Sequence, residues 1–64
     1  MELQTAISVA NGLKKRGYSP LVTYNLVSLT YDVVLLENGE TKFTFITCLE
    51  DLMSFLETNE FNDN

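Results

Sequence analysis

Asp32, Glu40 and Lys42 are the residues whose types and order could support a reaction. Two carboxylates can hold a divalent cation, and a nearby lysine can stabilise the charge on a phosphate that is being cleaved. Such a site needs its carboxylates within a few ångströms of one ion. Asn38-Gly39 precedes Glu40 and, between apolar runs, is the strongest short signal for a β-hairpin. The hairpin therefore decides whether the carboxylates can meet.

A two-residue turn at Asn38-Gly39 separates these side chains. Side chains alternate along a strand, so Asp32 points to one face of the sheet, and Glu40 and Lys42 point to the other. The sequence therefore predicts no metal site and no metal-dependent catalysis, and only a bulge that shifts the alternation would restore them. The order of the acids and the lysine resembles that of PD-(D/E)xK nucleases, whose minimal core is larger. We expect a protein that is not an enzyme, with a minimal nuclease of that type as an alternative.

Two amphipathic segments predict helices. The first covers residues 2–16, and Gly17 follows its last turn as a ready C-terminal cap. The second begins at Thr47, because Thr47 and Glu50 fit the S/T-x-x-E capping box, in which Glu50 reaches back to the Thr47 N–H. The apolar stripe of this second helix consists of Leu49, Leu52, Met53 and Leu56.

Three strands connect the two helices. Ser19-Pro20 starts an extended segment, and strands are predicted at about residues 21–26, 29–37 and 40–47. No glycine or proline marks the turn near Val27-Ser28, so one long bent strand is the alternative there. We predict a single α+β domain over residues 1–58, a three-stranded antiparallel sheet with two helices in the order α-β-β-β-α. Both helices are expected on one side of the sheet, and residues 59–64 are expected to form a frayed polar tail.

This layout is similar to that of double-stranded-RNA-binding domains and of small HicA-type RNA-cleaving toxins. The stretch LKKRGY, residues 13–18, resembles the junction between the first helix and the first strand of the toxins. The resemblance implies the fold without the activity. The toxins use a catalytic histidine and this chain has none, while the RNA-binding domains hold phosphates where this chain has Glu50 and Asp51. A nucleic-acid-associated domain or a toxin–antitoxin component is the alternative function.

Charge and cysteine content restrict the remaining possibilities. The net charge is −5, and most of the acids follow residue 32, which disfavours nucleic acid and membrane surfaces as direct partners. With no histidine and one cysteine, the chain lacks a zinc ligand set, and no cofactor is expected. Cys48 is predicted to be a small buried hydrophobe. A single cysteine and no signal peptide indicate a cytoplasmic protein.

The two apolar faces of the predicted sheet indicate the function. Val34, Leu36, Phe43 and Phe45 share the face of Asp32, and we expect the opposite apolar face to be the one that the helices leave uncovered. Exposed contiguous apolar surface marks an interface, so we expect a homodimer or a protein partner, with helices split between the two faces as the alternative. The expected partner-binding residues are Tyr31, Val33, Leu35, Ile46, Glu50, Asp51, Glu57 and Glu60.

In size and charge the chain resembles small acidic inhibitor proteins of phages and mobile elements, of the anti-CRISPR or anti-restriction type. That resemblance implies a stoichiometric inhibitor without enzymatic activity. Its partner would be a basic, nucleic-acid-binding host protein, engaged through the acidic and apolar patches of the chain.

Overall fold

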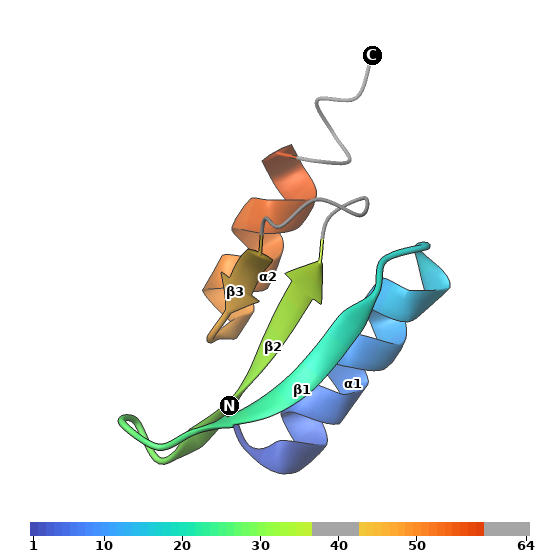
Figure 1. The fold of residues 1–64 in the computed structure, drawn as a ribbon. Helices are drawn as coiled ribbons and strands as arrows, with labels where there is room; N and C mark the ends of the chain where they lie inside the picture. Colours follow the sequence, from blue (N-terminus) through green and yellow to red (C-terminus); the bar gives the residue numbers. More distant parts are fainter. Residues whose placement is uncertain (37–42, 59–64) are drawn as a thin grey trace.

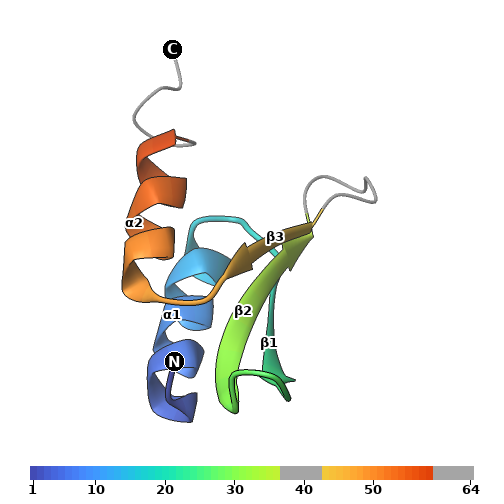
Figure 2. The same cartoon turned by 90° about the vertical axis from the view of Figure 1, so that its left-hand side faces the viewer.

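The computed structural model describes residues 1–36 and 43–58 of the 64-residue chain. Its elements are α1 (Leu3–Lys15), β1 (Pro20–Asn25), β2 (Thr30–Leu36), β3 (Phe43–Ile46) and α2 (Leu49–Leu56). The strands form one antiparallel sheet in the order β1-β2-β3, and both helices lie on the same side of it (Figures 1 and 2). The predicted α+β class and the order α-β-β-β-α are confirmed. Neither described helix is long and apolar enough to cross a membrane.

Gly17 ends α1, as its sequence position predicts. Its φ of +93° lies in the left-handed region, which a residue without a Cβ adopts at little cost. The Tyr18 N–H donates to the Leu13 carbonyl and the Gly17 N–H donates to the Lys14 carbonyl, each at 3.1 Å, which is the pattern of a Schellman motif. The motif turns the chain back toward the sheet, and it brings the Tyr18 ring edge-on to Phe55 of α2, with 5.1 Å between the ring centroids.

The turn between β1 and β2 occupies residues 26–29, close to the predicted position. The side chain of Asn25 organises it, since its Oδ1 accepts hydrogen bonds from the N–H groups of Val27 and Ser28. Leu29 closes the turn with a φ of +60° and donates its N–H to the Asn25 carbonyl at 2.8 Å. This asparagine-centred turn explains how a hairpin forms here without glycine or proline.

A single apolar core fills the space between the helices and the sheet. Ala6, Val9 and Leu13 of α1 pack with residues of the sheet and with Phe55 of α2. The sheet contributes Val33, Leu35 and Ile46, which are at most 1% exposed. The helices therefore cover the sheet face of the odd-numbered β2 residues, and neither of the two described helices covers the other face (Figure 2).

The register of β2 with β3 differs from the predicted one by two residues. Leu36 pairs with Phe43, and Val33 pairs with Ile46, whereas a two-residue turn would have paired Leu36 with Thr41. The predicted turn at Asn38-Gly39 lies outside the described residues. A shift of two leaves every side chain on its predicted face, because the alternation has a period of two.

Replacing Leu29 by glycine should raise the free energy of unfolding by roughly 0.5–1 kcal/mol, because a left-handed conformation is costly for a residue with a Cβ. The Leu29 side chain is 68% exposed, so little burial is lost. Leu26 is also exposed and lies in the same turn without a positive φ, which makes Leu26→Gly the matched control. Urea unfolding would contradict the proposed strain if both glycines lowered the stability equally.

Candidate functional site

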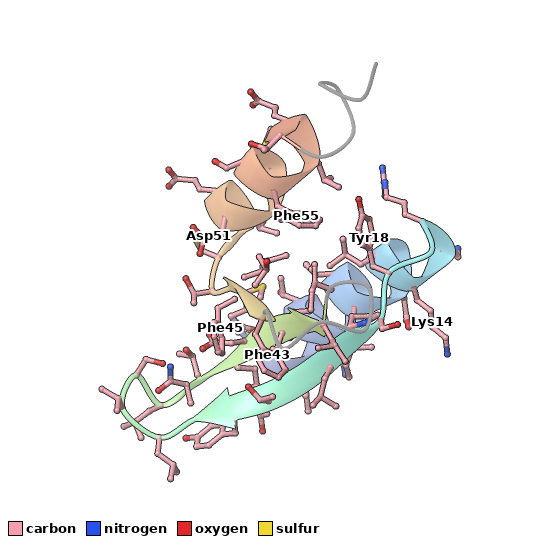
Figure 3. The ribbon with its side chains drawn as sticks, turned by 45° about the horizontal axis from the view of Figure 1, so that its top comes forward. Lys14, Tyr18, Phe43, Phe45, Asp51 and Phe55 are labelled. Atoms are coloured by element: carbon pink, nitrogen blue, oxygen red, sulfur yellow. The ribbon has the colours of Figure 1, made fainter. Side chains whose placement is uncertain are left out.

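The sheet face opposite the helices is an exposed apolar surface. We call it the outer sheet face and define it by Leu21, Val34, Leu36, Phe43 and Phe45, which the strand registers place together. Phe45 is 62% exposed, Phe43 is 55% exposed and Leu21 is 64% exposed. Both phenylalanines come from β3, next to α2 (Figure 3). Contiguous apolar side chains of this kind mark a contact surface for another molecule.

Asp32 lies on the same face and is almost completely buried, at 5% exposed. Its Oδ2 accepts a hydrogen bond from Asn25 Nδ2 at 3.0 Å, while its Oδ1 has no hydrogen-bond partner among the described residues. Glu40 and Lys42, the other residues of the hypothetical nuclease site, lie outside the described residues. Within residues 1–36 and 43–58, no three acidic, histidine or cysteine side chains gather as metal ligands.

The expected apolar binding patch is wrong, because the helices cover that face. Val33, Leu35 and Ile46 are buried in the core, and Tyr31 is half-buried against it. None of the three buried side chains can contact a partner while the chain is folded. The exposed apolar residues are instead those that share the sheet face of Asp32. Two of them, Phe43 and Phe45, are candidate binding residues that the sequence interpretation missed.

The expected acidic residues occupy different environments. Glu50 is exposed in the first turn of α2 and Glu57 is exposed as the C-cap residue that follows the helix, and neither side chain fixes the start of the helix. Asp51 has such a role, since its Oδ2 accepts hydrogen bonds from the Thr47 N–H at 3.0 Å and from the Thr47 hydroxyl at 2.6 Å. Glu60 lies outside the described residues. The outer sheet face and the exposed acidic side chains therefore lie on neighbouring elements, because α2 packs on β3.

The predicted capping box at Thr47 is therefore wrong, because the N-cap residue of α2 makes no side-chain cap hydrogen bond and the carboxylate that contacts Thr47 belongs to the next acid along the chain. Cys48, not Thr47, is the N-cap residue of α2, and Asp51, not Glu50, reaches back to the Thr47 N–H. The Thr47 hydroxyl, followed by the Thr47 N–H, holds the pKa of the Asp51 carboxyl below its ordinary value, against a rise from burial. Cys48 is exposed, so its predicted burial is wrong as well. Its place between β3 and α2 removes it from the core.

Two hollows lie on either side of α2. One, of about 370 Å³, is lined by side chains of β3 and α2, namely Thr44, Phe45, Asp51, Ser54, Phe55 and Thr58. The other, of about 230 Å³, lies between α1 and α2 and includes Gly12, Leu52 and Leu56. Only Phe55 of α2 is buried, while Leu49 and Met53 of its predicted apolar stripe are exposed. A helix that buries one residue leaves much of its surface available for contacts.

Comparisons with known proteins add no constraint to this surface. No protein-family model, no curated protein and no solved structure matches the chain.

Replacing Asp51 by alanine should lower the free energy of unfolding at neutral pH, whereas Glu50→Gln should leave it nearly unchanged. Because the pKa of Asp51 is lower in the folded than in the unfolded chain, its contribution is complete above the ordinary carboxyl pKa of about 4. That contribution disappears as the pH falls through the lowered value. Urea unfolding at neutral and at acidic pH should show the Asp51 deficit shrinking in acid. A deficit independent of pH, or a larger loss for Glu50→Gln, would contradict this role of Asp51.

Proposed function

We propose that this chain is a non-enzymatic protein-binding module that acts by occupying the surface of a basic protein partner. The exposure of Phe43 and Phe45 on the outer sheet face carries the proposal. Aromatic side chains are enriched at protein interfaces, where they dominate the binding energy. The proposal assigns the protein to the cytoplasm, because a secreted chain of this length would ordinarily contain several cysteines and this one contains one.

The outer sheet face is too small to form a stable protein interface by itself. Two phenylalanines and two leucines at these exposures offer roughly 300–400 Å² of apolar surface, against about 800 Å² per partner in an ordinary stable interface. The remaining area has to come from neighbouring surface. The acidic side of α2 is the adjoining candidate, because α2 packs on β3.

The charge of the chain indicates the chemistry of the partner. The net charge is −5, and Glu50 on α2 and Glu57 at the C-cap of that helix are exposed. Opposite charges at the rim of an interface accelerate association and exclude wrong partners. A partner with a basic surface, such as one that binds nucleic acid, has the complementary charge. Occupation of that surface would make the chain a stoichiometric inhibitor of the partner.

Changing both Phe43 and Phe45 to serine should abolish the retention of partner proteins from a lysate, because it removes the aromatic anchors of the outer sheet face. The control is a chain with Leu26→Ser and Val27→Ser, which removes two exposed apolar side chains at the far hairpin turn. Quantitative mass spectrometry of the retained proteins compares the two. Equal retention by both variants would remove the outer sheet face from the proposal.

Glu57→Lys tests the charge argument separately. It should slow association with a retained partner and weaken the salt dependence of the rate, while circular dichroism shows an intact fold.

The outer sheet face should also allow self-association. A sedimentation equilibrium experiment should show a dimer at micromolar concentration, and Phe45→Lys should shift the population toward the monomer. Phe45 is the appropriate probe because it is exposed, whereas a lysine at the fully buried Val33 would destabilise the fold itself. A strictly monomeric wild-type chain would exclude the dimer and leave the hetero-partner as the occupant of this face.

A further inference from the structure

The edge of the sheet at β3 presents backbone groups to an additional strand. β3 is the last strand of the sheet, so one of its sides has no neighbouring strand among residues 1–36 and 43–58. Tyr31 shows which β2 residues direct their backbone groups toward that side, because it exchanges both of its backbone hydrogen bonds with Met1, each at 2.8 Å. By alternation, Val33 and Leu35 face β3 as well, and they pair with Ile46 and Thr44.

The backbone groups of Phe43 and Phe45 therefore point away from β2. Each of these two residues carries one donor and one acceptor in the plane of the sheet. Beyond the end of β3, Met1 occupies the corresponding place beside Tyr31. Met1 thus already pairs with the sheet at one point on this side. Among the described residues no strand pairs with the outer edge of β3, so this edge is open to another molecule.

A groove runs beside this edge. It is shallow and open, measures about 370 Å³, and is bordered by Asp51, Ser54 and Phe55 of α2 and by Thr58, which follows the helix. Asp51 lies three residues before Ser54 and four before Phe55, so these side chains share one side of the helix. Figure 3 shows Asp51 and Phe55 on α2 and Phe45 on β3, the two elements that bound the groove. A strand edge with a helix beside it is the geometry in which extended peptides bind by strand addition.

We propose that the groove between β3 and α2 binds an extended, basic segment of the partner, which pairs with β3 as a fourth strand. This inference rests on the proposed protein-binding function and names the form of the bound segment. Every second side chain of the segment enters the groove, and the others extend the outer sheet face beside Phe43 and Phe45. The segment therefore alternates basic or polar side chains with apolar ones.

The negative charge at the groove favours a basic bound segment. Among the described residues that line it, Asp51 is the only ionisable one, while Glu50 is exposed on α2 and Glu57 is exposed just after that helix. Asp51 Oδ2 accepts the two hydrogen bonds from Thr47, and these bonds together with the Cys48 thiol lower the pKa of the carboxyl, so the carboxylate stays charged and attracts a lysine or arginine. A second copy of this chain would bring the same acids to the groove and be repelled. A basic segment is attracted.

The test uses two capped seven-residue peptides, one alternating lysine with valine and one alternating glutamate with valine. They are titrated into the ¹⁵N-labelled chain. The lysine peptide should shift the amide signals of residues 43–46, 51, 54, 55 and 58, and it should slow hydrogen exchange at Phe43 and Phe45 by at least about tenfold, since a paired amide exchanges only after the peptide leaves. The glutamate peptide should bind far more weakly.

Matched variants locate the peptide. Ser54 on α2 and Glu57 at its C-cap are both exposed, but of these two Ser54 alone lines the groove, so Ser54→Trp should abolish binding and Glu57→Trp should not. Asp51→Asn should weaken binding about 2- to 5-fold, as expected for a surface ion pair, and Glu57→Gln should weaken it less.

Equal binding of both peptides, or no effect of the lysine peptide on residues 43–46, would overturn the proposal. Signal changes confined to Leu21 and Val34 would also contradict peptide binding in the groove. They would leave the outer sheet face as a binding surface, and with it the proposed function, in place.

Discussion

The burial of one sheet face by α1 is the interaction on which the rest of the structure depends. Ala6 is completely buried, so α1 approaches the sheet closely enough to exclude solvent from Val33 and Leu35. The described residues form one such layer, and none of their five elements covers the opposite face of the sheet. The strands nevertheless carry apolar side chains on both faces. The exposure of Phe43 and Phe45 is thus a direct consequence of where the single core lies.

The position of α2 follows from local interactions more than from an extensive core. The Asp51 side chain fixes the start of the helix against Thr47, and Phe55 anchors its last turn to Tyr18 and the core. The Schellman motif at the end of α1 delivers Tyr18 to that contact. With so little of α2 buried, grooves remain on both of its sides. One of them lies against the open edge of β3, which is where a bound strand could use the backbone and the helix together.

The sequence was sufficient for the order of the elements, because several boundaries have their own signal, such as Gly17 at the end of α1, whereas the turn between β1 and β2 has neither glycine nor proline. It also predicted correctly which described side chains of β2 and β3 share a sheet face, because a register error of two residues leaves the alternation unchanged. It did not reveal which of the two sheet faces packs against the helices, because both faces carry apolar side chains. Asp32 was the neglected signal: an ionisable residue on a central strand favours the face that no helix covers. The contact of Asp51 with Thr47 was missed because Glu50 and Asp51 are adjacent acids, and only geometry shows which one reaches Thr47.

The two contact features on β3 have complementary roles, because they depend on different parts of the chain. The outer sheet face offers apolar area, which gives binding energy but little direction, since apolar contact is non-directional. The strand edge offers hydrogen bonds that require an extended partner in a fixed register. Asp51 adds a charge at one point along that edge, and it is held in place by its own bonds to Thr47. A partner that satisfied all three would be recognised by its backbone conformation, its alternating apolar side chains and its charge, which is more selective than any one of these alone.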